Sequence, residues 1–204
     1  MTGFAKPLEA RFITSSTDVK QCPEPLLPEY AFIGRSNVGK SSLINMITGQ
    51  QMLAKISSTP GKTKLINHFL INESWYLVDL PGYGYARSAR SERKSWLQTI
   101  EKYLLNRTNL MTAFILLDSR LPLQASDLEI INWFGQIGLH FVILLTKTDK
   151  LTHNKLKANQ DAIIKELLMY WEELPPVIQT SSQTKLGRDE IIEFIEETNR
   201  LYKN

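Results

Sequence analysis

The chain has 204 residues, of which 43% are hydrophobic and 22% charged, as expected for a globular protein with one substantial core. It has no apolar run near the ~20 residues of a membrane helix and no signal-peptide core at its start, and its single cysteine excludes an internal disulfide. These features predict a cytoplasmic protein without membrane contact. The net charge of +3 is uneven, since residues 1–100 carry 12 Lys and Arg against 7 Asp and Glu, which predicts a polyanionic partner.

The predicted elements alternate between strands and helices. In chain order, strands are expected at 8–15, 30–33, 65–71, 75–79, 113–117, 141–145 and 176–180, and helices at 40–48, 91–106, 126–137, 153–170 and 187–201. Several of the strands are uninterrupted apolar runs, which are typical of a parallel sheet with helices on both faces. Residues 72–74 join two strands as a hairpin and add one antiparallel strand at an edge. The expected fold class is therefore α/β.

A glycine-rich loop follows the strand 30–33 and opens the helix 40–48. It fits the P-loop pattern G-x-x-x-x-G-K-[ST] at every fixed position. Strand, loop and helix together direct backbone N–H groups and a helix N-terminus at phosphate oxygens. The loop predicts binding of a nucleoside triphosphate, with Lys40 on the β- and γ-phosphates and Ser41 on Mg²⁺. Its residues are Gly34, Arg35, Ser36, Asn37, Val38, Gly39, Lys40 and Ser41.

A second motif follows the strand 75–79 and reads Asp79, Leu80, Pro81 and Gly82. A carboxylate at a strand end can hold Mg²⁺ through its water shell, and a nearby glycine lets a backbone N–H approach the γ-phosphate. The long polar loop 49–63 precedes this hairpin. A loop hydroxyl that binds Mg²⁺ only beside a γ-phosphate would make the loop a switch. Thr63 and Thr59 are the candidates, and Thr63 is preferred because it adjoins the strand.

A third motif, Thr146, Lys147, Thr148 and Asp149, follows the strand 141–145. An Asp here can accept two hydrogen bonds from guanine, at N1–H and the 2-amino group, whereas adenine offers neither donor there. The Lys147 stem would lie over the base. After the last strand, backbone N–H groups of the next loop could meet the guanine O6, although a turn with a helix cap explains that loop equally well. Its residues are Thr180, Ser181, Ser182 and Gln183.

These motifs, in this order, resemble the EngB (YihA/YsxC) family of bacterial Ras-like GTPases, over about residues 8–200. The run Asp79-Leu80-Pro81-Gly82-Tyr83-Gly84-Tyr85-Ala86 is the most specific part, and Thr146 stands where GTPases at large have Asn. The resemblance implies a G domain at 23–204 with an added N-terminal strand within 1–22. It also implies roles in assembly of the large ribosomal subunit and in cell division and septation.

The resemblance further implies the site residues. Lys40, Thr63 and Gly82 would act in hydrolysis, and Ser41, Thr63 and Asp79 would hold Mg²⁺. The resemblance also adds five residues to the expected GTP-binding residues of the motifs above. They are Gly61, Lys62, Thr63, Lys64 and Leu65. Tyr83 stands where Ras-like GTPases carry a water-orienting Gln, so slow hydrolysis is expected. Asn37 matches a P-loop Asn that coordinates K⁺ in some relatives, and a loop-stabilising hydrogen bond is an equally good role.

The hypothesis from the sequence is that the protein is a monomeric GTP-binding switch with weak GTPase activity, whose partner is the maturing large ribosomal subunit. Two rivals remain, a P-loop metabolite kinase, which should prefer ATP, and a GTPase that acts on protein partners at the division site without RNA. The basic excess favours RNA. Its most concentrated part is expected on one face of a helix that follows the second motif, at Arg87, Arg90 and Lys94.

Overall fold

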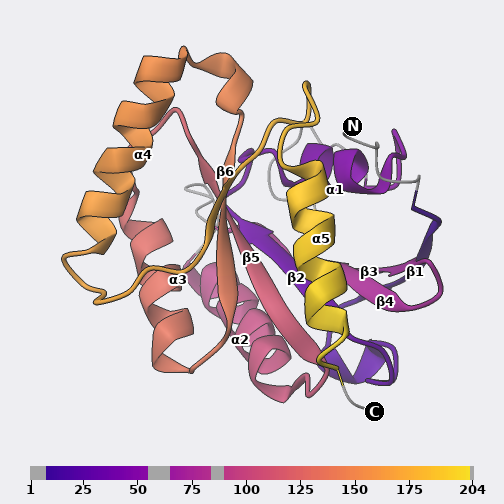
Figure 1. Cartoon of the computed structure of the whole chain (residues 1–204). Helices are drawn as coiled ribbons and strands as arrows, with labels where there is room; N and C mark the ends of the chain where they lie inside the picture. Colours follow the sequence, from indigo (N-terminus) through magenta and orange to yellow (C-terminus); the bar gives the residue numbers. More distant parts are fainter. Residues whose placement is uncertain (1–7, 55–64, 84–89, 203–204) are drawn as a thin grey trace.

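The computed structural model describes residues 8–54, 65–83 and 90–202, with the backbone alone for 90–97. Strands and helices alternate through most of these ranges (Figure 1). The strands are β1 (Ala10–Ser16), β2 (Glu29–Gly34), β3 (Ile66–Ile71), β4 (Trp75–Asp79), β5 (Leu110–Asp118), β6 (Phe141–Thr146) and β7 (Val177–Gln179). The α-helices are α1 (Lys40–Thr48), α2 (Arg90–Asn106), α3 (Ala125–Gln136), α4 (His153–Leu167) and α5 (Arg188–Asn199).

The strands form one sheet in the order β1-β3-β4-β2-β5-β6-β7. The pairs from β4 to β7 are all parallel, whereas β3 is antiparallel to both β4 and β1. The predicted α/β fold with one antiparallel strand and an added N-terminal strand is therefore confirmed. The antiparallel strand is β3, and β1 covers the edge that β3 would otherwise present.

Two apolar layers cover the sheet, one on each face. On one face, α1 and α5 pack side chains such as Ile44 and Ile192 against Phe32 and Phe114. On the other face, residues of α2, α3 and α4 pack against neighbouring strand residues such as Ile33. Successive strand residues thus point to opposite faces and both are buried, which explains the uninterrupted apolar runs in the sequence. Figure 1 shows α5 and α3 on opposite sides of the sheet.

The predicted helices and strands are present, and their ends lie within three residues of the predicted positions. The largest differences are three residues, at β5, which starts at Leu110 rather than at residue 113, and at α4, which ends at Leu167 rather than at residue 170. Met169 and Tyr170 donate backbone hydrogen bonds to residues three positions earlier, so the chain tightens into turns there. None of the described helices is long and apolar enough to cross a bilayer.

A buried polar cluster ties α2 to the amino-terminal ends of the central strands. The Glu29 carboxylate, fully buried, accepts hydrogen bonds from the Tyr103 hydroxyl at 2.6 Å and from Arg107 Nε at 3.1 Å. His68 Nε2 lies 3.4 Å from the same carboxylate. Burial alone would raise the pKa of Glu29, but its contacts with His68 and Arg107 outweigh burial and lower that pKa to about 2. The cluster lies at the start of β2, and the P-loop lies at its other end.

Candidate nucleotide site

The P-loop connects β2 to α1 at the carboxyl edge of the parallel strands, where ligands of open α/β sheets bind. Gly39 caps α1 with a φ of 107°, which is strained for any residue with a Cβ. Lys40 and Ser41 form the first turn of the helix. The helix therefore presents its N-terminal N–H groups where the loop turns, as phosphate binding requires.

Lys40 and Asp79 meet at the centre of the site. Asp79 ends β4, is 4% exposed, and its Oδ1 forms an ion pair with Lys40 Nζ. Asp79 Oδ2 accepts a hydrogen bond from Asn67 Nδ2 at 3.3 Å. Ser41 follows Lys40 directly in the first turn of α1, and its hydroxyl is the oxygen that the P-loop pattern assigns to Mg²⁺. These hard oxygen donors fit Mg²⁺, which takes few protein ligands and shares substrate phosphates and water.

The segment after Asp79 is hydrogen-bonded to the P-loop strand. Leu80 N donates to Phe32 O at 3.0 Å, Tyr83 N to Gly34 O at 3.1 Å, and Ser36 N to Tyr83 O at 3.0 Å. Gly82 lies so close to this strand that an added Cβ would be 3.1 Å from Gly34 O. A close backbone approach therefore favours glycine at residue 82.

The Tyr83 side chain is buried in the core beside α3. It is 4% exposed, and its hydroxyl donates a hydrogen bond to Asp127 Oδ1 at 2.9 Å. Burial and the Asp127 carboxylate raise the pKa of Tyr83 well above its ordinary value, so the phenol stays protonated and acts as the donor. Asp127 Oδ2 also accepts from Gln124 N at the start of α3. This conformation anchors the residue after Gly82 to a helix.

The loop after β6 is attached to the P-loop by two side chains. The Thr146 hydroxyl lies 2.7 Å from Val38 O and 3.1 Å from Leu117 O, within hydrogen-bond range of both. Lys147 Nζ donates to Asn37 O at 2.6 Å. Thr146, which replaces the Asn usual at this position, therefore still links the two loops. Lys147 has a left-handed backbone with a φ of 61°, which turns its side chain back over the P-loop.

Asp149 is oriented by the loop after β7. The Ser181 hydroxyl donates to Asp149 Oδ1 at 2.7 Å, and Lys150 Nζ lies 3.1 Å from Oδ2. The hydrogen bond from Ser181, together with Lys150, lowers the pKa of Asp149, so the carboxylate is ionised at neutral pH. Thr148 N and its hydroxyl both donate to Thr180 O, at 3.3 and 3.0 Å. An ionised acceptor held in this way can receive the N–H donors of guanine.

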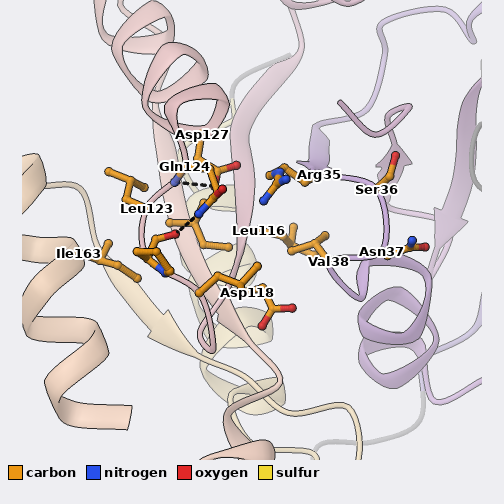
Figure 2. Close-up of a pocket in the computed structure, with 13 residues that line it drawn as sticks. Arg35, Ser36, Asn37, Val38, Leu116, Asp118, Leu123, Gln124, Asp127 and Ile163 are labelled. Atoms are coloured by element: carbon orange, nitrogen blue, oxygen red, sulfur yellow. Dashed lines mark hydrogen bonds between the residues drawn. The ribbon is translucent and has the colours of Figure 1, made fainter. Parts of the chain in front are cut away.

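A pocket opens on the α3 side of the P-loop (Figure 2). The Arg35 side chain is directed across it toward the start of α3, where the charge of Asp127 attracts it. Arg35 was predicted to bind nucleotide, and in this conformation only its backbone belongs to the phosphate loop. The residues around the pocket include Asn37, Val38, Asp118, Gln124 and Ile163.

The sheet brings four predicted groups of residues together, because each lies at the carboxyl end of a parallel strand. They are the P-loop and residues 79–82, 146–149 and 180–183. Leu65 lies just before β3. The remaining predicted binding residues lie outside the described residues, as does the alternative Thr59. They are Gly61, Lys62, Thr63 and Lys64.

Sequence reasoning missed three side chains. Ser181 was considered only for its backbone, and Asp127 was not assigned to the site. Asp118 ends β5 and bonds to Lys147, but it was not considered at all. Its place directly after an apolar strand, like that of Asp79, was the available signal.

Comparison with known proteins identifies the family. The profile of the family described as 50S ribosome-binding GTPase matches residues 29–147. A Bacteroides fragilis protein named probable GTP-binding protein EngB is 56% identical over 191 residues, covering 94% of this chain and 95% of that protein. Its Porphyromonas gingivalis namesake is 55% identical over 192 residues, covering 94% and 96%.

Solved structures agree on the fold. The structure of a probable GTP-binding protein EngB has a TM-score of 0.61 at 21% identity, covering 85% of this chain and all of that one. The structure of Era with MgGDPNP and a fragment of 16S ribosomal RNA has a TM-score of 0.65 at 20% identity, covering 84% and 56%. At these identities the structures show a shared Ras-like fold, and the sequence relatives show more: the chain belongs to the EngB family of GTPases.

Proposed function

We propose that this chain is a cytoplasmic, monomeric GTP-controlled switch with slow hydrolysis. We further propose that it serves assembly of the large ribosomal subunit and normal cell division and septation. The observation that carries the guanine assignment is the Asp149 carboxylate, held by Ser181 at the edge of the sheet where the P-loop also ends. Adenine would leave this charged acceptor without donors, which disfavours ATP and the kinase alternative.

The roles of the individual residues follow from their places. Residues 34–41 would surround the phosphates, with Lys40 exchanging its partner Asp79 for phosphate oxygens. Ser41 and Asp79 would hold Mg²⁺, with Thr63 as the expected third ligand. Lys147 would lie against the base, and residues 180–183 would close its far side. Mg²⁺ supplies charge neutralisation on the phosphates when bound. We propose that residues 1–22 form an N-terminal extension and that residues 23–204 form the G domain.

Slow hydrolysis is supported by the Tyr83 side chain. Its hydroxyl donates its hydrogen bond to Asp127, and a phenol cannot orient an attacking water as the amide of a Gln does. K⁺ at Asn37 is the proposed aid to hydrolysis, with a structural role as the alternative. Turnover in K⁺ against Na⁺ at equal ionic strength, in wild type and Asn37→Ala, separates the two. Equal rates in both salts would leave Asn37 with the structural role.

The ribosomal partner is supported by the family description and by the basic first half of the chain. The proposed contact surface includes Arg87, Arg90 and Lys94. Arg87 lies outside the described residues, and the side chains of the other two are not described either. Basic side chains that contact RNA phosphates release counterions, so binding should weaken as salt rises.

Sedimentation with separated ribosomal subunits tests this proposal. With a GTP analogue bound, the protein should co-sediment with the large subunit, and less so with GDP bound. Reversing the charge of Arg87, Arg90 and Lys94 should abolish sedimentation while GTP affinity stays within about threefold, because these side chains need not touch the nucleotide. Binding to neither subunit in either nucleotide state would favour a GTPase of protein partners alone.

A further inference from the structure

Asp118 is a carboxylate at the end of β5 that the motifs above do not include. It pairs in register with Thr146 of β6, so it lies beside the loop that holds Lys147 and Asp149. Its side chain is 10% exposed and sits near the P-loop residues Asn37 and Val38 in the pocket of Figure 2.

Asp118 holds two cations with good geometry. Lys147 Nζ donates to Oδ2 at 2.9 Å. Arg120 approaches as a fork, with Nε 2.8 Å from Oδ1 and Nη2 2.7 Å from Oδ2, and its backbone N donates to Oδ1 at 3.1 Å. Burial alone would raise the pKa of Asp118, but the hydrogen bonds from Arg120 and Lys147 outweigh it and lower that pKa to about 2. The carboxylate is therefore charged at neutral pH.

Lys147 is fixed at both ends as a result. Its backbone leaves β6 in a left-handed conformation, and its ammonium is shared between Asp118 Oδ2 and Asn37 O. Between these ends, its stem passes over the P-loop, since a Cβ added to Gly39 would lie 3.5 Å from Lys147 Cε. A lysine side chain has high rotamer entropy when free. Asp118 removes much of that freedom before any nucleotide binds.

Arg120 is the second cation bound to Asp118, and it is also close enough to Asp149 to be influenced by that carboxylate's charge. Its side chain is 43% exposed, and the charges of Asp118 and of Asp149 both stabilise its guanidinium. Asp118 thus lies between the two cations Arg120 and Lys147. Without its negative charge, the two positive charges would repel each other.

We propose that Asp118 is a positioning residue for nucleobase recognition, which fixes Lys147 against the P-loop so that the slot between Lys147 and Asp149 exists before the base arrives. The inference rests on the proposed guanine nucleotide binding and extends the recognition set to a residue that would act through Lys147. Pre-organisation of this kind raises affinity by reducing the ordering required on binding.

The test compares Asp118→Ala and Asp118→Asn with wild type, measuring dissociation constants for GDP and for a GTP analogue. Loss of one charged hydrogen bond to Lys147 should weaken both nucleotides by roughly tenfold to a hundredfold in Asp118→Ala. The ratio between the two nucleotides should stay within about twofold, because the base is common to both. Asp118→Asn keeps an acceptor without the charge and should fall between Asp118→Ala and wild type.

A purely structural role for Asp118 predicts a different result. Thermal unfolding of the nucleotide-free protein would then show the whole effect, with the nucleotide affinities of the folded protein unchanged, and this outcome would overturn the inference. Arg11→Ala is the matched control, because Arg11 makes a similar fork on Glu73 at the β1 edge of the sheet, with Nε 3.3 Å from Oε1 and Nη2 3.0 Å from Oε2. It should leave both affinities unchanged.

A double-mutant cycle shows whether Asp118 acts through Lys147. If it does, Asp118→Ala combined with Lys147→Ala should bind nucleotide within about twofold of Lys147→Ala alone. Fully additive losses would contradict the inference while leaving the proposed function intact. If wild-type protein shows no preference for GTP over ATP, the proposed function fails and the inference fails with it.

Discussion

The base end and the phosphate end of the candidate site are held together in different ways. At the proposed base end, Asp149, Lys147 and Thr146 are each held by a neighbouring loop. At the proposed phosphate end, Lys40 is paired with Asp79, a partner that a phosphate would replace. The base end is therefore pre-organised, while nucleotide binding at the phosphate end exchanges one ion pair for another.

This difference predicts how the two ends respond to substitution. Variants at the base end should weaken GDP and GTP alike, because both carry the same base. Variants at the phosphate end should change the stability of the nucleotide-free protein and the preference between the two nucleotides.

The largest effect is expected for Lys40→Met. Asp79 is 4% exposed, and removing its partner leaves a buried charge uncompensated. We expect a loss of about 3–5 kcal/mol in the free energy of unfolding without nucleotide, measured by urea denaturation. Lys40→Met combined with Asp79→Asn should regain part of that stability. A double variant less stable than Lys40→Met would show that the ion pair does not stabilise the phosphate end.

Glu29→Gln provides a comparison far from both ends. The pKa of Glu29 is lowered to about 2 in the folded protein, so its contribution to stability is present above the unfolded pKa of about 4.5 and is lost as pH falls toward 2. The variant should lose ~3 kcal/mol at pH 7 and show a flatter stability profile between pH 4.5 and 2. Nucleotide affinity should not change, and a change would mean that the sheet transmits strain to the site.

Tyr83→Phe sharpens the account of the phosphate end. It removes the hydroxyl that donates a hydrogen bond to Asp127 and leaves that buried carboxylate without this donor. The loss should cost about 1.5–3 kcal/mol of stability. Because Tyr83 holds Gly82 beside the P-loop, a GTP analogue should lose more affinity than GDP. Tyr30→Phe, which removes a buried hydroxyl bonded to α5, is the control and should leave the nucleotide preference unchanged. If Tyr83→Phe lost the same affinity for both nucleotides, Tyr83 would have no specific role in binding the γ-phosphate.

The smallest effect is expected for Thr146→Val. The substitution keeps the shape of the side chain but removes the hydroxyl that faces Val38 O and Leu117 O. We expect a loss of about 1 kcal/mol in binding, equal for GDP and the GTP analogue, by isothermal titration. A selective loss of the GTP analogue would place Thr146 with the phosphate end instead.

The sequence predicted the fold well because local patterns determine most of it. Apolar runs of strand length between amphipathic helices specify a parallel sheet, and the glycine loop fixes where the sheet meets a ligand. The N-terminal strand was predicted as an addition, but not that it would pair with β3. That pairing joins residues fifty or more positions apart, and no local pattern encodes it.

The site was predicted less completely than the fold. Glycines, the P-loop lysine and Asp149 are recognisable because their spacing follows from the shape of a nucleotide. Asp118, Asp127 and the Ser181 hydroxyl act through other side chains. Their roles depend on which loops the sheet brings together, so they become visible only in three dimensions.

Nucleotide competition with Asp149→Asn tests the central claim most directly. Displacement of labelled GDP by GTP, ATP and xanthosine triphosphate should be measured for the variant and for wild type. Wild type should strongly prefer GTP. The variant should lose about 2–4 kcal/mol of GTP binding and gain affinity for xanthosine triphosphate, whose ring carbonyl accepts where the guanine amino group donates. A variant that binds GTP as tightly as wild type would contradict the guanine assignment.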